Sequence, residues 1–349
     1  MSAMASGVDA GQRAFISYYT PHRLYGLCWG TKATEFRLAT STFIPGEYVN
    51  KLQVLQPSQD GQELVRTLEI DHPYPPTKVM WSPQSFGNNV EYLATTADYL
   101  RIWAVKDTSL ERHATISNKR NQETCAPLTS FDWNEAEPSM IGTSSIDTTC
   151  TIWDLNNISA PKQQIIAHDD EVYDMAFSPE ANIFGSVGGD GSLRLFDLRS
   201  LESSTIVYET PELRPLLRIA WNKQDDRFVA TMIAGSPKVV ILDLRNVSRP
   251  MFELNQHSAS VNSICWSPHS RSHICSAGED RTAILYDISS AITSESQSDG
   301  APGLSESQTL NATTFFSSKS PINQIRWSPT QPSCVAICDE DATHVVQLL

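Results

Sequence analysis

Short phrases built on an aromatic residue followed by Ser, Asn or Gly recur along the whole chain. The aromatic residues of the seven phrases are Trp29, Trp81, Trp133, Phe177, Trp221, Trp266 and Trp327. Successive phrases lie 52, 52, 44, 44, 45 and 61 residues apart. A repeat of this period is typical of an architecture in which each copy is one structural unit that packs against its neighbours. The chain is therefore expected to fold as one array of seven units.

Each copy carries the same pattern of short strands. After the aromatic phrase come a polar turn, a strand of small residues such as residues 183–190 (IFGSVGGD), and a third strand that closes on a large residue followed by Asp. The clearest closing pairs are Trp153–Asp154, Phe196–Asp197, Leu242–Asp243 and Tyr286–Asp287. Four short strands in about 40–45 residues with such an ending are typical of a WD40 blade. The sequence predicts an all-β, seven-bladed WD40 β-propeller.

The two ends of the chain predict how the ring closes. A strand-like run, residues 12–19 (QRAFISYY), precedes the first repeat, and the chain stops at Leu349 after the third strand of the seventh copy. We expect the N-terminal strand to complete the last blade, because an open ring would leave exposed strand edges. The predicted organisation is a disordered N-terminus at residues 1–11 and a single propeller at residues 12–349.

One stretch breaks the rhythm of the repeat. Residues 289–313 are rich in Ser, Gly and Gln and poor in apolar side chains. This composition predicts a disordered loop between the sixth and seventh copies. The loop is expected to have no function of its own, although a regulated or partner-binding role stays open.

The composition limits the classes of function. The 349 residues include 40 acidic and 26 basic side chains, a formal net charge of −14, which argues against binding to nucleic-acid phosphates. No run approaches the roughly 18 apolar residues of a membrane-spanning helix. The first residues lack the apolar core of a signal peptide, and the seven cysteines show no close pairing. These features predict a soluble intracellular protein.

Two copies contain residue types used by Ser-His-Asp hydrolases. They are His168, Ser186 and Asp190 in the fourth copy, and His257, Ser276 and Asp280 in the sixth. A catalytic set is needed once, whereas His72, His168 and His257 each stand ten residues before the Ser of their aromatic phrase. We interpret the sets as structural groups that satisfy buried hydrogen bonds between strands. No catalytic residue, metal site or cofactor is expected, and no enzymatic activity.

Longer runs of the chain resemble one family within the WD40 class. They are Phe43–Leu55, Leu93–Trp103, Cys125–Asn134, Gly142–Leu155, Arg194–Glu209 and Ile322–Ser333. These runs are similar to the transparent testa glabra / anthocyanin-regulator family over nearly the whole chain from about Tyr18 onward. Two features depart from the family pattern: residues 289–313 form a long insertion, and the sixth copy closes on Tyr286 where Trp is usual.

The resemblance implies a non-catalytic scaffold. Plant members join MYB and basic helix-loop-helix transcription factors. The animal member holds dual-specificity tyrosine-regulated and homeodomain-interacting kinases and is described as a cullin-4 ligase-associated factor. The expected function is therefore assembly of kinases or transcription regulators by a monomer of the cytoplasm and nucleus, with no direct nucleic-acid or membrane partner. The alternative is a substrate receptor of a cullin-4-type ubiquitin ligase.

The alternative function has its own candidate residues. The third-strand endings FDLR (Phe196–Arg199) and LDLR (Leu242–Arg245) resemble the WD-x-R box that binds such receptors to the ligase adaptor. The box would consist of Asp197 with Arg199 and of Asp243 with Arg245. Each Arg has a simpler alternative role, which is to pair with acidic neighbours at the end of its blade.

The scaffold function predicts a partner site on the narrow face around the central pore, here called the top face, where loops lead into the inner strands. Positions counted back from the aromatic phrases give the candidates Arg23, Tyr25, Pro75, Glu171, Tyr173 and Leu217. Tyrosine offers apolar area with a polar tip, as interface anchors do. The alternative is that each side chain packs against its own neighbouring loop. Glu171 and the acidic balance predict a partner segment with Lys or Arg beside apolar anchors.

Overall fold

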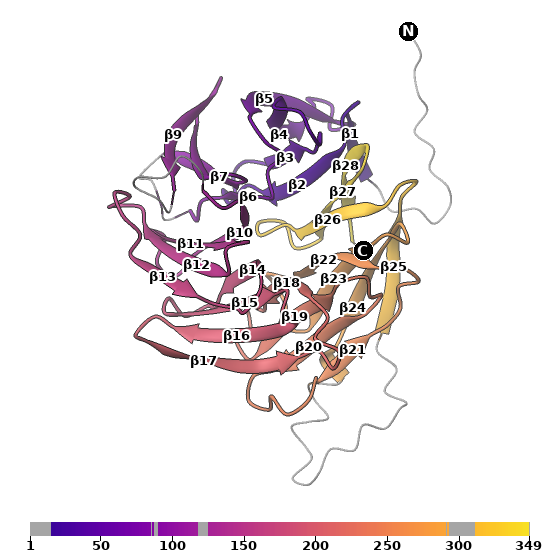
Figure 1. The fold of residues 1–349 in the computed structure, drawn as a ribbon. Coiled ribbons are helices and arrows are strands. Elements are labelled where there is room, and N and C mark those ends of the chain that lie inside the picture. The colour runs from indigo at the N-terminus through magenta and orange to yellow at the C-terminus, as the bar shows by residue number, and fades with distance from the viewer. Residues whose placement is uncertain are drawn as a thin grey trace.

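The computed structural model describes residues 15–84, 86, 90–117, 125–290, 292 and 311–348. These residues form seven antiparallel four-stranded sheets around a common centre (Figure 1). The predicted all-β, seven-bladed propeller is confirmed. The predicted disordered N-terminus at residues 1–11 lies outside the described residues, and so does most of the predicted loop at residues 289–313.

The first four blades follow one another along the chain, each with its inner strand first and its outer strand last. Blade one contains β2 (Leu24–Trp29), β3 (Leu38–Thr42), β4 (Asn50–Pro57) and β5 (Leu64–His72). Blade two contains β6 (Lys78–Trp81), β7 (Glu91–Thr96), β8 (Leu100–Val105) and β9 (Leu110–Ile116). Blade three contains β10 (Leu128–Trp133), β11 (Met140–Ser145), β12 (Thr149–Asp154) and β13 (Gln163–Ile166). Blade four contains β14 (Val172–Phe177), β15 (Ile183–Gly188), β16 (Ser192–Asp197) and β17 (Ser200–Glu209).

The last three blades complete the circle. Blade five contains β18 (Leu216–Trp221), β19 (Phe228–Ile233), β20 (Val239–Asp243) and β21 (Phe252–Leu254). Blade six contains β22 (Val261–Trp266), β23 (His273–Gly278), β24 (Thr282–Asp287) and β25 (Asn311–Ser317). Blade seven contains β26 (Ile322–Trp327), β27 (Cys334–Asp339) and β28 (Ala342–Gln347), and its outer strand is β1 (Phe15–Tyr19) from the start of the chain.

Ring closure joins the two ends of the chain. β1 runs antiparallel to β28, with Phe15 opposite Val346 and Tyr19 opposite Ala342. The indole N–H of Trp29 donates to the Arg326 carbonyl oxygen at 2.9 Å, which ties the inner strand of blade one to that of blade seven. The predicted completion of the last blade by the N-terminal strand is confirmed.

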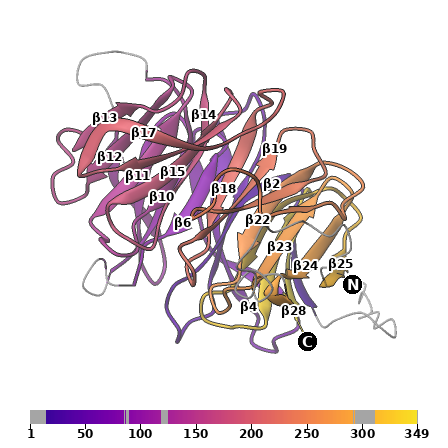
Figure 2. The same ribbon diagram turned by 90° about the horizontal axis from the view of Figure 1, so that it is seen from below.

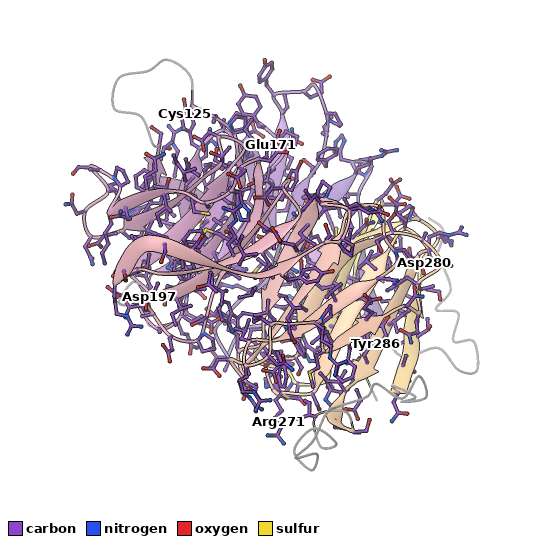
Figure 3. All side chains as sticks on the ribbon, turned by 60° about the horizontal axis from the view of Figure 1, so that its bottom comes forward. Cys125, Glu171, Asp197, Arg271, Asp280 and Tyr286 are labelled. Atoms are coloured by element: carbon purple, nitrogen blue, oxygen red, sulfur yellow. The ribbon has the colours of Figure 1, made fainter. Side chains whose placement is uncertain are left out.

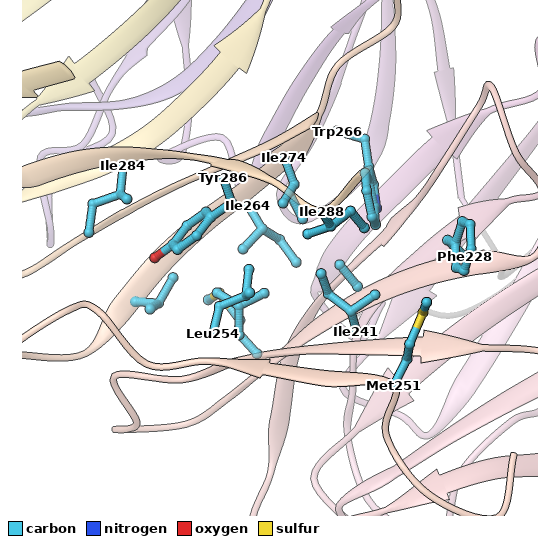
Figure 4. Close-up of a cluster of buried hydrophobic side chains, with 14 residues drawn as sticks. Phe228, Ile241, Met251, Leu254, Ile264, Trp266, Ile274, Ile284, Tyr286 and Ile288 are labelled. Carbon is cyan, nitrogen blue, oxygen red and sulfur yellow. The ribbon is translucent and has the colours of Figure 1, made fainter. Parts of the chain in front are cut away.

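Apolar side chains fill the spaces between neighbouring blades. Between blades five and six, Phe228, Ile241 and Leu254 pack with Ile264 and Trp266 in one buried cluster (Figure 4). All seven aromatic residues that mark the repeat are buried in such clusters or beside them. Since every blade needs a large side chain at the same place in its inner strand, the aromatic phrase recurs at the blade interval.

Glycine is required where an entering loop crosses the end of a second strand. A Cβ on Gly278, the last residue of β23, would collide with the carbonyl oxygen of Ser260. The backbone N–H of the next residue, Glu279, donates to that same oxygen at 2.8 Å. The close backbone approach therefore explains why this second strand ends on glycine.

The strand order defines two faces of the ring. Loops that join an outer strand to the next inner strand, and loops that join second to third strands, lie on the top face; the remaining loops lie on the bottom face. In Figure 3, Glu171 and Cys125 lie toward the upper side of the blades, and Asp197 and Arg271 lie toward the lower side. Helices able to cross a membrane are absent from the part of the chain that the structure describes.

Candidate functional site

The side chains of His168, Ser186 and Asp190 meet inside blade four. Nδ1 of His168 lies 3.0 Å from Asp190 Oδ1, and Nε2 lies 2.8 Å from Ser186 Oγ. A carboxylate only accepts, so the Nδ1–H group donates to Asp190. The same contacts recur in blade six at 2.9 Å and 2.6 Å, among His257, Asp280 and Ser276.

These sets join the loop that enters a blade to the strands of that blade. Ser186 is fully buried in β15, so its hydroxyl is closed to a substrate from solution. Burial acts to raise the pKa of Asp190, but the hydrogen bond and charge of His168, with the bonds from Ser192, outweigh burial and hold the pKa well below its usual range. The carboxylate therefore stays ionised and bonded to His168, and the burial of Ser186 favours a structural role for the set over a catalytic one.

The closing residue of the third strand extends these hydrogen-bonded chains. In blade two the indole N–H of Trp103 donates to Thr95 Oγ1 at 2.9 Å, and Thr95 lies 3.1 Å from His72 Nε2. In blade six Tyr286 takes the place of the usual Trp, and its hydroxyl lies 3.4 Å from Ser276 Oγ. The replacement of Trp by Tyr therefore keeps a polar contact with the second strand.

The residues of the WD-x-R endings lie on the bottom face. Arg199 follows β16 and pairs with Asp197, with 2.6 Å between Nη2 and Oδ2. Arg245 follows β20 and pairs with Asp243 in the same way. The hydrogen bond from Arg199 lowers the pKa of Asp197 to about 2. Both guanidinium groups are exposed, so each can meet a partner while it pairs with its own Asp.

Aromatic side chains gather on the top face of blades one and two. Phe43, Tyr48 and Val49 come from the loop between β3 and β4, and Tyr74 comes from the loop between β5 and β6. These four side chains are between 38% and 71% exposed. The ring centroids of Tyr48 and Tyr74 lie 5.4 Å apart, and those of Tyr25 and Phe43 lie 5.7 Å apart. We call Tyr25, Phe43, Tyr48, Val49 and Tyr74 the top-face aromatic patch.

The loop that carries most of this patch is held in one conformation. Gly46 turns the chain with a positive φ of 77°. The buried side chain of Asn50 accepts a hydrogen bond from the Ile44 N–H at 2.8 Å and donates to the Glu47 carbonyl oxygen at 3.2 Å. Because these bonds order the loop before any partner arrives, the loop backbone loses little conformational entropy on binding.

Three of the predicted top-face residues border or belong to the patch. Tyr25 is a member, and Pro75 directly follows Tyr74. The carbonyl oxygen of Arg23 accepts from the Phe43 N–H at 2.7 Å, while its guanidinium group lies 3.8 Å from Glu340. Arg23 and Tyr25 therefore border Phe43 of the patch, and Pro75 borders Tyr74.

The other three predicted residues lie at blades four and five. Burial, followed by the charges of Glu171 and Asp170, raises the pKa of the half-buried Tyr173. The backbone carbonyl of Glu171 accepts from the Gly189 N–H at 2.8 Å. Leu217 packs against the buried cluster between blades five and six. The sequence analysis did not predict four members of the patch, Phe43, Tyr48, Val49 and Tyr74. A signal was present, because their loops contain Pro or Gly and carry large apolar residues outside any predicted strand.

Polar side chains close the central pore beneath the top face. The Arg218 guanidinium group of blade five donates to the Tyr25 hydroxyl of blade one at 2.6 Å. Lys78 of blade two lies 3.4 Å from Asp174 of blade four. The Ser130 hydroxyl of blade three donates to the same carboxylate at 2.5 Å. The first two contacts tie blades that are not neighbours, and the third joins blades three and four.

The described residues hold no group of three or more His, Cys, Asp and Glu side chains placed to bind a metal ion. Burial raises the pKa of the Cys28 and Cys265 thiols, which lie near the pore. Neutral buried thiols act as small apolar side chains.

A family model described as WD domain, G-beta repeat matches residues 159–197 and 248–287. Each matched range holds the outer strand of one blade and the first three strands of the next, β13–β16 and β21–β24. The ranges end at Asp197 and Asp287, the residues that close the third strands.

Three known proteins are similar to most of the chain. The DDB1- and CUL4-associated factor 7 homolog of Dictyostelium discoideum is 45% identical over 340 residues, which cover 97% of this chain and 99% of that protein. An uncharacterized WD repeat-containing protein of Schizosaccharomyces pombe is 32% identical and covers 91% of this chain and 80% of its own length. A WD repeat-containing protein of Saccharomyces cerevisiae is 36% identical, and the match covers 78% of this chain and 58% of that protein.

Proposed function

The chain belongs to the WD-repeat family of the DDB1- and CUL4-associated factor 7 homolog, and from this membership we propose that it is a non-catalytic scaffold that binds partner proteins on its top face. The top-face aromatic patch carries the proposal. Four of its five side chains are exposed, and three of these four come from one ordered loop. A soluble surface without a partner gains nothing from such a group.

The chemistry of the face describes the partner segment. Apolar rings offer anchor sites, and Glu171 with the overall charge of −14 favours a segment that carries Lys or Arg. Following the resemblance to the transparent testa glabra / anthocyanin-regulator family, the proposed partners are dual-specificity tyrosine-regulated kinases or MYB and basic helix-loop-helix factors. On the same basis we propose that the scaffold acts as a monomer in the cytoplasm and nucleus.

A double variant, Tyr48→Ala with Tyr74→Ala, tests the top-face proposal. Both side chains are exposed, so the melting temperature should stay unchanged. Affinity purification from cells, with identification of co-purifying proteins, should show loss of at least one partner by the variant. Partners that all remain bound to the folded variant would contradict the site.

A matched control removes the same number of exposed apolar side chains from a different part of the surface. Ile166→Ala with Ile206→Ala removes two exposed apolar side chains from β13 and β17, on the outside of the ring. This control should keep every partner that the unmodified protein binds.

The second proposal concerns the cullin-4 ligase. It is favoured by the name of the Dictyostelium relative and by the two exposed guanidinium groups on the bottom face. In this proposal Arg199 and Arg245 contact the ligase adaptor, while the top face stays free to hold a substrate. The two functions therefore share one molecule and use opposite faces.

Charge reversal separates the two faces. Arg199→Glu with Arg245→Glu should abolish co-purification with the cullin-4 adaptor and leave top-face partners bound. The control reverses two other exposed cations in ion pairs, Arg66→Glu with Lys106→Glu, on blades one and two. Adaptor binding that survives the first reversal, or that is lost equally in the control, would contradict the bottom-face site.

A further inference from the structure

A groove of about 480 Å³ opens on the side wall of the ring, between the outer strands of blades six and seven. One wall is formed by β25 and the residues that follow it, and the other by β28 and its partner strand β1. β25 and β28 lie in the same part of the ring (Figure 2). Binding sites usually have volumes of about 300–1,000 Å³, so this groove is large enough to hold part of a ligand. We call this space the rim groove; its lining includes Phe15, Tyr19, Phe316, Lys319, Asp341 and His344.

Blade seven lacks a histidine that three other blades carry next to the position of the groove. Ser318 stands ten residues before Ser328, the position that histidine takes in blades two, four and six. The histidine of blade seven is His344, which comes from β28 and lies 3.2 Å from Asp339 Oδ2. Since serine lacks the imidazole ring that this position carries in blades two, four and six, it leaves space beside Asp339 at the wall of the groove.

Aromatic rings surround His344 along one side of the rim groove. The ring centroids of Phe15 and Tyr19 lie 6.0 Å and 6.1 Å from the imidazole, and that of Phe316 lies 5.0 Å from it. Phe15 and Tyr19 are 41% and 70% exposed. The faces of aromatic rings are electron-rich and attract cations that approach within about 6 Å of the centroid.

Carboxylates add negative charge to the same wall. Burial acts to raise the pKa of Asp339, but the hydrogen bonds from His344 and Ser318 outweigh it and hold the pKa below its usual range. Asp341 is exposed at the groove and makes no ion pair with any described residue. Lys319 is the positive side chain of the opposite wall. Because Asp339 is buried and paired with His344, the groove presents the exposed Asp341 carboxylate and the Lys319 ammonium group beside exposed rings.

We propose that the rim groove binds an extended segment of a protein partner through one Lys or Arg side chain, placed between the rings of Phe15 and Tyr19 and the carboxylate of Asp341. The apolar neighbours of that cation in the segment contact Phe316. The exposed carboxylate of Asp341 matches a cationic side chain, and Lys319 limits the site to a single cation. Lys319 and Asp341 lie on top-face loops of blades six and seven, but none of the lining residues belongs to the top-face aromatic patch of blades one and two. The scaffold can therefore hold a second partner while the first stays bound.

The test uses fluorescein-labelled peptides of the sequence Gly-Ser-Leu-Xaa-Leu-Ser-Gly, with Lys, Arg, Gln or Glu at the variable position. Anisotropy titrations of the full chain at low salt should show binding of the Lys and Arg peptides at least about tenfold tighter than of the Gln peptide. Tyr19→Ala and Asp341→Asn should each weaken binding of the Lys peptide about fivefold or more.

Lys319→Ala is a variant for which we expect tighter, not weaker, binding. Removal of the competing cation should tighten binding of the Lys peptide, whereas an unspecific loss of structure would weaken it. Equal binding of the Lys and Gln peptides, no binding of either, or binding unaffected by Tyr19→Ala would overturn the proposal. The top-face double variant Tyr48→Ala, Tyr74→Ala should bind the Lys peptide normally, so failure of either site is visible separately.

A second copy of the chain is the competing occupant. Sedimentation velocity over a hundredfold range of concentration should show one species for the unmodified protein. A dimer that dissociates on Tyr19→Ala would overturn the proposal in favour of self-association.

Discussion

At the scale of single residues, His72 shows how the ring keeps a buried imidazole neutral. Its Nδ1–H group donates to the Tyr74 carbonyl oxygen at 2.6 Å, and the Thr95 hydroxyl donates to Nε2 at 3.1 Å. Burial, followed by the charge of Arg101, lowers the pKa of His72 from 6.5 to about 4, against the opposing effects of the Tyr74 hydrogen bond and of Asp98. Both ring nitrogens are satisfied without a positive charge.

The lowered pKa of His72 predicts loss of stability in mild acid. Between pH 6.5 and about 4 the unfolded chain binds a proton on this residue that the folded chain does not, so stability falls as the pH falls through that window. The contribution lost between pH 7.5 and pH 5 should be about 2 kcal/mol.

Urea unfolding at both pH values should show this loss in the unmodified protein and a pH dependence smaller by that amount in His72→Gln. The difference between the two proteins isolates His72 from the other titrating groups. Identical pH dependence in both proteins would contradict the assignment.

Asp190→Ala tests the structural interpretation of the His-Ser-Asp sets. The change leaves the donors of His168 and Ser192 unpaired inside the blade and should cost roughly 1–3 kcal/mol of unfolding free energy. Partner binding should fall only as far as the fraction of folded protein falls. The control is Asp169→Ala, which removes a neighbouring exposed carboxylate. A variant with unchanged melting behaviour and a selectively lost activity would restore the catalytic interpretation.

At the scale of elements, the ring depends on one strand from the far end of the sequence. Ile16 and Tyr18 of β1 pack against the cluster that blades one and seven share. β1 also covers the edge of β28, whose backbone groups would otherwise face solvent.

Deletion of residues 1–19 should therefore lower the melting temperature and cause aggregation that increases with protein concentration. Deletion of residues 1–11 serves as the control, because it leaves β1 intact and should change neither property. Differential scanning fluorimetry and light scattering measure the two effects. A deletion of residues 1–19 that stays monomeric and equally stable would show that β1 is dispensable for closure.

At the scale of the whole molecule, charged side chains across the pore add contacts that adjacent blades do not supply. Asp174 is buried, and burial acts to raise its pKa, but the charges of Lys78 and Arg218 outweigh burial and hold the pKa below its usual value. Its carboxylate also accepts from the Ile219 N–H at 3.1 Å. One side chain thus joins blades two, four and five.

Removal of this carboxylate should be among the most destabilising single changes. Asp174→Ala leaves Lys78 and Arg218 without their counter-charge in the closed pore and should cost about 3–5 kcal/mol. Tyr25→Phe removes a neutral partner of Arg218 and should cost only about 1 kcal/mol. Chemical denaturation of both variants gives the comparison, and equal costs would contradict the dominant role of Asp174.

The regular spacing of the aromatic residues from Trp29 to Trp327 was sufficient to predict seven blades. The strand-like run at residues 12–19 was sufficient to predict that the N-terminal strand closes the ring. These features are readable because each blade solves the same packing problem, so the same residue types return at a fixed interval. The histidine and aspartate of blades four and six were equally readable, since their spacing repeats with the blade.

The top-face aromatic patch and the rim groove could be found only from the tertiary structure. Phe43 and Tyr74 lie 31 positions apart in the chain, and Phe15 and Phe316 lie at its two ends, yet each pair borders one surface. Leu217 and Tyr25 follow the same counting rule, but one packs between blades and the other joins a surface patch. The sequence by itself determined the number of blades and their cores, because local periodicity sets which side chains must be buried. Only the closed ring decided which loops meet on a face and which blade edges leave a groove, because those contacts join segments with no periodic relation.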